Sequence, residues 1–359
     1  MRISSRLASA GRRSAAPILA PSGAPSVAAL LAVTLLAAAG SLAPAARAGT
    51  VAEFLRLGVG ARALALGEGM LSVEHDPSAL YWNPALMAGS PRPAAEVMHA
   101  ENFGGAAGFD AVACTVPLGG GPGEAVGIGV LRLSVDDIPT TGNFRFDDVG
   151  ADGVAGSHDA GEGDGRWEPG EPVHADASAV EWRSDSEWAV LVGYARALGE
   201  AGAAGVCAKY LRQAVAGRQS TGFGLDVGAH LALSDGLELA ARVSDLTSTR
   251  VVWDNGTRES IPPRLELAVA RQLRLGRRAS VRAVLGAGSD TRDVGRGPRE
   301  WHGGLEYRLR DRLFLRAGAT SGRPTFGAGV GLARFRVDYA ALPFHELGAT
   351  HRLSALARW

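Results

Sequence analysis

Apolar and polar residues alternate along most of the chain after residue 94, which is the period of a half-buried β-strand. The last residues show it clearly, because Leu353, Ala355 and Trp359 alternate with Arg352 and Arg358. The same alternation recurs upstream and predicts about fourteen strands. They span roughly 94–101, 108–117, 125–135, 186–198, 203–214, 221–234, 237–246, 262–273, 278–287, 299–310, 312–320, 325–331, 334–342 and 349–359.

The connections between these strands are sorted by length. The long ones, 136–185, 247–261 and 288–298, all follow odd-numbered strands, whereas those after even-numbered strands are short, such as the hairpin signal Asp235-Gly236. A soluble β-sandwich also shows alternation but has no reason to sort its loops in this way. Outer-membrane barrels do, with tight periplasmic turns and long outer loops. We therefore expect an all-β fold, a transmembrane antiparallel β-barrel in the bacterial outer membrane.

The first residues predict export. Residues 1–48 run from a basic start through an apolar core to Ala46-Arg47-Ala48, the pattern of a cleaved signal peptide. No later apolar run is long enough to predict a membrane-spanning helix. The net charge of zero argues against a nucleic-acid partner. We expect residues 94–359 to form the barrel, with residues 49–93 as a separate segment before it.

That segment contains two Asx-Pro pairs, Asp76-Pro77 and Asn83-Pro84. Asp and Asn are good helix N-caps, and proline suits the first helical position. Each pair therefore predicts the start of a short helix before the first strand. A barrel of this size has a lumen to fill, so we interpret residues 49–93 as a helical hatch inside it. An ordinary N-terminal cap on a soluble fold is the alternative.

The same segment carries a family resemblance. "FLRLGVGARALALG" from Phe54, followed by "DPSALYWNPALM" from Asp76, resembles the N-terminal signature of the PorV/PorQ family within the wider FadL-like group of outer-membrane proteins. Stretches beginning at Leu133, Ser220 and Arg336 agree in order, so the resemblance spans nearly the whole mature chain. It implies a fourteen-stranded barrel with a hatch, in agreement with the strand count above.

The resemblance implies two functions, neither of them enzymatic. PorV-like proteins are implicated in type IX secretion, with secretion components and exported cargo as partners, whereas FadL-like proteins pass hydrophobic small molecules. Only the hatch triplet Asn83, Pro84 and Ala85 transfers as a motif, with a structural or gating role. Tyr81 and Trp82 beside it could line an apolar pocket or simply pack the hatch. Besides outer-membrane lipid, the other expected partner is the barrel-assembly machinery, which reads the terminal aromatic residue.

No catalytic motif is present in the sequence. The stretch from Gly58 to Ala63 fits a loose G-x-G-x-x-A pattern, but it lacks the βαβ setting that a dinucleotide site requires. We therefore expect no cofactor, apart from one candidate metal site.

That candidate lies in the long acidic connection, expected on the outer side. Aligning Gly165 with the turn glycine of an EF-hand loop places several carboxylates at ligand positions, although Ala160 occupies the first. The alternative is a solvated acidic surface loop without metal. The candidate calcium ligands are Asp159, Glu162, Asp164, Glu168 and Glu171.

Charged residues also alternate onto the presumed lumen face of the late strands. They either line a polar channel or bind the hatch, and anchoring is favoured because charges in a filled lumen are usually paired. These residues are Glu306, Arg308, Arg310, Arg312, Arg316, Arg334, Arg336 and Asp338.

Overall fold

The structure is a computed structural model that describes residues 51–69, 71, 75–141, 144–175, 180–291, 300–344 and 348–359. The predicted signal sequence, residues 1–48, lies outside the described residues. Among the described residues, no helix has the length and apolar character needed to cross a membrane.

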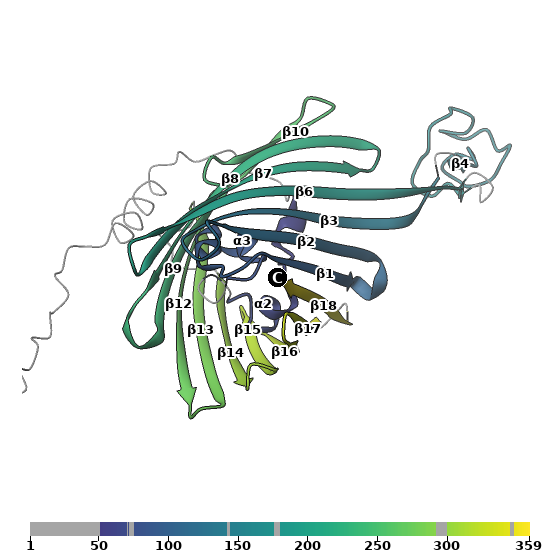
Figure 1. The fold of residues 1–359 in the computed structure, drawn as a ribbon. Helices are drawn as coiled ribbons and strands as arrows, with labels where there is room; N and C mark the ends of the chain where they lie inside the picture. The colour runs from purple at the N-terminus through teal and green to yellow at the C-terminus, as the bar shows by residue number, and fades with distance from the viewer. Residues whose placement is uncertain are drawn as a thin grey trace, which may run out of the picture.

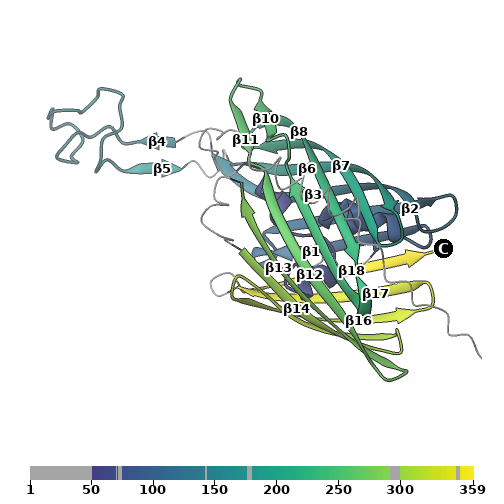
Figure 2. The same cartoon turned by 90° about the vertical axis from the view of Figure 1, so that its left-hand side faces the viewer.

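One antiparallel sheet closes on itself to form a barrel (Figures 1 and 2). Consecutive barrel strands pair with each other, and the first pairs with the last, for example through Val97 and Ala355. The described residues give fourteen barrel strands, which confirms the prediction. They are β1 (Ala94–Asn102), β2 (Ala107–Leu118), β3 (Glu124–Thr141), β6 (Val180–Leu198), β7 (Gly202–Val215), β8 (Arg218–Ala232), β9 (Leu237–Ser244), β12 (Arg264–Leu275), β13 (Ala279–Asp290), β14 (Glu300–Leu309), β15 (Leu313–Thr320), β16 (Arg323–Leu332), β17 (Phe335–Phe344) and β18 (Gly348–Arg358).

The wall of the barrel is apolar outside and polar inside. Along β17, Phe335, Val337 and Tyr339 are 64%, 48% and 41% exposed, whereas Arg336 and Asp338 between them are 5% and 1% exposed. A soluble sandwich would bury the first set and expose the second. An exposed apolar belt around a closed barrel matches a lipid-facing surface, so the fold is that of an outer-membrane barrel.

The two ends of the barrel differ. β1 begins and β18 ends at the end with short turns, and the long connections lie at the other. The connection predicted as 136–185 is shorter than expected, because β3 and β6 remain paired beyond a β-bulge between Val135 and Ile138. Beyond them a small hairpin, β4 (Phe144–Phe146) with β5 (Val173–Ala175), projects away from the barrel (Figures 1 and 2). We call residues 144–175 the acidic lobe. A second hairpin, β10 (Thr249–Trp253) with β11 (Arg258–Ile261), extends β8.

The hatch, whose described part is residues 51–69, 71 and 75–93, lies inside the barrel. Its apolar side chains pack against inward-facing residues of the wall, and together they form the buried apolar core. Its short helices are η1 (Glu53–Arg56), α2 (Ala61–Ala65), α3 (Ala79–Trp82) and η3 (Pro84–Gly89).

Candidate functional site

The Asn83-Pro84-Ala85 triplet joins the hatch to the barrel wall. The Asn83 side chain caps η3 by accepting a hydrogen bond from the Ala85 backbone N–H at 3.1 Å, with Pro84 at the first helical position as predicted. Its Nδ2 donates to the Leu71 carbonyl at 2.9 Å and to the Ala229 carbonyl of β8 at 3.1 Å. Asn83 is fully buried; its bond to Ala229 holds the triplet against β8, and the other two fix the local fold of the hatch.

Glycines in the wall make room for this contact. A Cβ atom added at Gly205 of β7 or Gly228 of β8 would lie within 3.0 Å of Pro84 or Asn83, closer than real Cβ atoms approach other atoms. A Cβ atom added at Gly193 of β6 would likewise lie within 3.0 Å of the side chain of Leu80. The hatch therefore touches the backbone of three neighbouring strands, which helps to explain why this chain uses so much glycine.

Arg62 of α2 binds the wall through a buried bidentate ion pair. Its Nε and Nη2 donate to Glu306 of β14 at 2.7 and 2.6 Å, and both side chains are 1% exposed. Glu306 also accepts from Arg316 of β15 at 2.7 Å, and Arg316 donates to Asp338 of β17 at 2.7 Å. A planar guanidinium suits such paired contacts better than an ammonium does.

Asp76 of the hatch completes this chain of charges. Its carboxylate accepts from Arg336 of β17 at 2.5 Å and from Arg358 at the end of β18, while Arg336 donates to Asp338 at 2.5 Å. The prediction that Asp76 caps a helix is wrong, because α3 begins after Ser78 and has no side-chain cap. We call Arg62, Asp76, Glu306, Arg316, Arg336, Asp338 and Arg358 the hatch-seat network. It lies towards the short-turn end.

Only part of the predicted set of lumen charges faces the lumen. Glu306, Arg316, Arg336 and Asp338 lie there: Glu306 and Arg336 bind the hatch directly, and Arg316 and Asp338 link them within the wall. Arg308 is half-buried, 3.3 Å from Glu306. The other three lie outside it, because β14 and β16 end before them and the tight turns expose their side chains. These three are Arg310, Arg312 and Arg334.

A cavity of about 120 Å³ lies between the hatch and the wall, in the half of the barrel nearer the long loops. On the hatch side its lining is largely apolar and includes Leu55, Leu80, Tyr81 and Trp82. The Tyr81 hydroxyl donates to the Leu55 carbonyl at 2.5 Å, so its polar end is already bonded. Tyr81 and Trp82 line this cavity, which is one of the two roles that the sequence left open.

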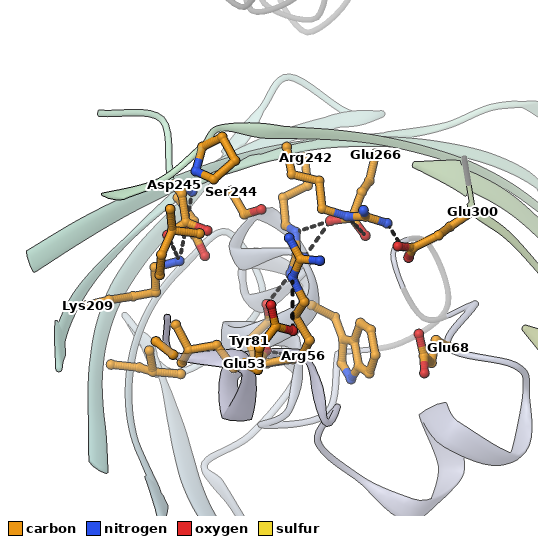
Figure 3. Close-up of a pocket in the computed structure, with 18 of the residues that line it drawn as sticks. Glu53, Arg56, Glu68, Tyr81, Lys209, Arg242, Ser244, Asp245, Glu266 and Glu300 are labelled. Carbon is orange, nitrogen blue, oxygen red and sulfur yellow. Dashed lines mark hydrogen bonds and ion pairs between the residues drawn. The ribbon is translucent and has the colours of Figure 1, made fainter. Parts of the chain in front are cut away.

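The wall side of the cavity is charged, unlike the apolar pocket expected of a FadL-like barrel (Figure 3). Lys209 of β7, the only lysine in the chain, lies 2.7 Å from Asp226 and 2.6 Å from Asp245. Further along the wall, Arg242 binds Glu266 at 2.5 Å. Arg264 then binds Glu300 at 2.7 Å. These pairs satisfy most of the buried charge, which would otherwise be costly.

Glu68 and His302 complete the lining. Glu68 lies on the hatch side with its carboxylate 3.7 Å from the imidazole of His302, and Figure 3 shows it near Glu300. Burial, followed by the nearby carboxylates of Glu300 and Glu266, raises the pKa of Glu68 to about 7. His302 is 4% exposed, and within the described part of the chain neither ring nitrogen has a hydrogen-bond partner.

The candidate calcium ligands do not converge in the acidic lobe. Glu171 accepts hydrogen bonds from the backbone N–H groups of Val149, Gly150 and Glu168, and the carboxylates of Asp159, Glu162 and Asp164 also bind backbone amides of the lobe. In the described residues, no group of three or more His, Cys, Asp or Glu side chains could hold a metal ion. Calcium binding by the lobe stays a prediction.

Comparison with solved structures identifies the fold. The toluene transporter TodX of P. putida superposes with a TM-score of 0.50 at 12% sequence identity, covering 84% of this chain and 97% of that one. The fold is that of a FadL-like barrel. Transporter TbuX of Ralstonia pickettii (TM-score 0.47, 11% identity, 84% and 98% coverage) and a Pseudomonas aeruginosa FadL homologue (0.47, 12%, 81% and 96%) match less well. No protein-family model matches the sequence, and no curated relative does.

These findings confirm the predicted barrel fold. The PorV/PorQ resemblance stays a prediction. Arg62, Glu68 and the charged wall of the cavity were not predicted from the sequence. One signal was available, since a lone lysine in an arginine-rich chain marks an unusual position at Lys209.

Proposed function

We propose that the protein is a passive outer-membrane channel for small amphipathic molecules, which pass between the hatch and the wall. The observation that carries this proposal is the cavity itself, with apolar and aromatic side chains on the hatch side and charged side chains on the wall side. A ligand with an apolar body and a polar head would satisfy both sides. The toluene transporters of the same fold support a role in uptake.

The hatch fills the lumen and is bound to the wall through the hatch-seat network and through Asn83, so it must move before a molecule can pass. The hatch-seat network closes the short-turn half, and the cavity lies beyond it. A molecule that enters from the long-loop side therefore reaches the cavity first and crosses when the hatch-seat network opens. Local opening of such elements is common where function requires it.

Uptake by intact cells tests the proposal, because the outer membrane is the barrier in question. The variant Ser244→Trp places an indole in the cavity from β9 and should abolish uptake of a radiolabelled short-chain amphiphile while leaving the folded barrel in the membrane. A variant in which a short Gly-Ser turn replaces residues 144–175 is the matched control and should retain uptake. Equal uptake by the wild-type protein and the Ser244→Trp variant would refute the proposal.

A second candidate function, protein engagement of the PorV/PorQ type, rests on the acidic lobe. The lobe has its own hairpin, projects beyond the barrel and exposes Val154, Trp167 and Val173. Exposed apolar side chains among carboxylates suit contact with another protein. Secretion components or exported cargo are the partners that this reading requires.

A pulldown from native outer membrane distinguishes the two functions. The lobe-deleted barrel should lose any secretion components and cargo that the intact barrel retains, and the Ser244→Trp variant should keep them. Identical protein recovery with and without the lobe would remove the second candidate.

A further inference from the structure

The cavity is lined by more negative than positive side chains. Six carboxylates line it, from Glu53, Glu68, Asp226, Asp245, Glu266 and Glu300, against the four cations of Arg56, Lys209, Arg242 and Arg264. Three of these cations are already bound to wall carboxylates at 2.7 Å or less. Arg56 lies at the rim, 46% exposed and 3.7 Å from Asp290. Without the rim residues Glu53 and Arg56, five carboxylates face three cations of the lining, and Arg352, buried beside the cavity and facing Glu68, leaves a surplus of one negative charge.

The surplus lies at Glu68. Its side chain is 24% exposed, and the imidazole of His302 lies 3.7 Å from its carboxylate, beyond hydrogen-bonding distance. Its backbone has φ of 64°, a left-handed conformation that is costly for glutamate, held by its N–H donating to the Ala63 carbonyl at 3.0 Å. The chain thus turns this carboxylate towards the cavity.

His302 provides an independent indication of a ligand. Buried polar groups in native proteins are nearly always hydrogen-bonded, so an imidazole whose two nitrogens have no partner among the described residues requires an explanation. His302 lines the same cavity, beside Glu68. A ligand head group with several N–H donors, placed between the two side chains, would bind the Glu68 carboxylate and the acceptor nitrogen of His302.

We propose that Glu68 and His302 form the head-group site for a small primary ammonium ion with a short apolar chain. The ammonium donates to the Glu68 carboxylate and to an acceptor nitrogen of His302, and its chain packs on Leu55, Leu80 and the Tyr81 ring. The proposal rests on the proposed channel function and specifies its substrate class. An anionic head group would add to the surplus of negative charge, and a neutral alcohol would leave it uncompensated.

The volume of the cavity limits the size of the ligand. The cavity of about 120 Å³ is somewhat smaller than an engineered cavity of about 150 Å³ that binds benzene in another protein. A chain of roughly four carbons with one head group is therefore suitable. n-Butylammonium, 1-butanol and butyrate have nearly the same size and differ in charge. They form a matched set of probes.

Acid should weaken binding of the ammonium. The pKa of Glu68 is about 7, so its carboxylate becomes protonated below neutral pH. The ammonium, with a pKa of about 10 as in lysine, stays charged below and above neutral pH in this range. The charged groups that face Glu68 are Glu266, Glu300, Arg264, Arg352 and His302.

Binding of the three probes to the purified barrel in detergent, measured by calorimetry, tests the inference. We expect n-butylammonium to bind at least about tenfold more tightly than 1-butanol or butyrate at pH 8, with the preference falling towards pH 6. Glu68→Gln should abolish both the preference and its pH dependence. Glu53→Gln removes a carboxylate from the exposed rim of the same cavity and should change affinity by less than about twofold.

The outcomes separate this inference from the channel proposal. Equal affinity for n-butylammonium and 1-butanol, or a preference that survives in Glu68→Gln, would overturn the inference, while loss of uptake in Ser244→Trp would still support the channel. His302→Gln keeps hydrogen-bonding groups and should retain part of the preference for n-butylammonium. It provides a second test in case Glu68→Gln does not fold. If no probe binds and uptake does not depend on the cavity, both proposals fail.

Discussion

Replacing Arg62 by methionine should release the hatch from the wall. The substitution removes the bidentate contact to Glu306 at 2.6 and 2.7 Å and leaves a buried carboxylate in place. Breaking a buried ion pair costs about 3–5 kcal/mol. Because Glu306 keeps Arg316 at 2.7 Å and Arg308 at 3.3 Å, we expect the lower end, about 3 kcal/mol.

Most of this cost should appear as local opening of the hatch, because the wall strands keep their ladders. The assay is maleimide labelling of a cysteine at the fully buried position Ala63, in a chain whose native Cys114 and Cys207 are replaced by alanine. When opening and closing are fast, labelling follows the population of the open state. A change of about 3 kcal/mol then raises the labelling rate roughly 140-fold.

The matched control is Arg56→Met, which removes an arginine of the same hatch that is 46% exposed and lies no closer than 3.7 Å to a carboxylate. Exposed pairs contribute about 0–1 kcal/mol, so labelling should rise less than about fivefold. Adding Glu306→Gln gives a double-mutant cycle, in which the two changes should be less than additive by about 2 kcal/mol. Labelling of Arg62→Met at the rate of Arg56→Met would refute the anchoring role of the network.

Three further predictions concern the hatch and the wall. Asn83→Ala should lower the free energy of unfolding by about 2–4 kcal/mol in urea titrations, because it removes the cap of η3 and leaves two buried carbonyls without their donor; a loss below about 1 kcal/mol would contradict this. Gly205→Ala should cost about 1–3 kcal/mol by pushing the hatch away, whereas Gly303→Ala, whose new Cβ has no neighbour nearer than 3.6 Å, should be neutral, and equal effects would count against the close contact. Because the pKa of Glu68 is raised from 4.5 to about 7, the folded state binds more protons than the unfolded state between these two pH values. The urea midpoint should therefore fall as pH rises through this range, and Glu68→Gln should remove that slope.

The barrel was predictable from the sequence because each strand depends on the pattern of residues that are neighbours in the chain. Each strand must place apolar side chains against lipid, so the alternation of Leu353 and Ala355 with Arg352 fixes which face points outward. The Asn83-Pro84 start of η3 was predictable for the same reason, since a cap acts within three residues. The ends of strands were less predictable: Arg310 continues the alternation of β14 in sequence but lies in a turn.

The site was harder to predict because its residues meet only after the barrel closes. Arg62 and Glu306 are separated by 244 positions, and nothing in either local sequence indicates the other. Asp76 shows the opposite error, since its local context favours a helix cap, but Arg62 of the hatch and two arginines from the distant strands β17 and β18 hold its carboxylate. Charges that pair across the lumen carry no periodic signal, so only the folded barrel brings them together.

The most direct test of the central claim is to locate a permeating molecule inside the barrel. A butyl-sized diazirine amphiphile would be photolysed with the protein in outer membranes, and the modified residues would be mapped by mass spectrometry with and without excess unlabelled amphiphile. The account predicts competed modification of residues that line the cavity, on the hatch around Leu55 and Tyr81 and on the wall around Ser244, and its loss in Ser244→Trp. Competed modification confined to the acidic lobe, or labelling of the outer face alone, would contradict a route between hatch and wall.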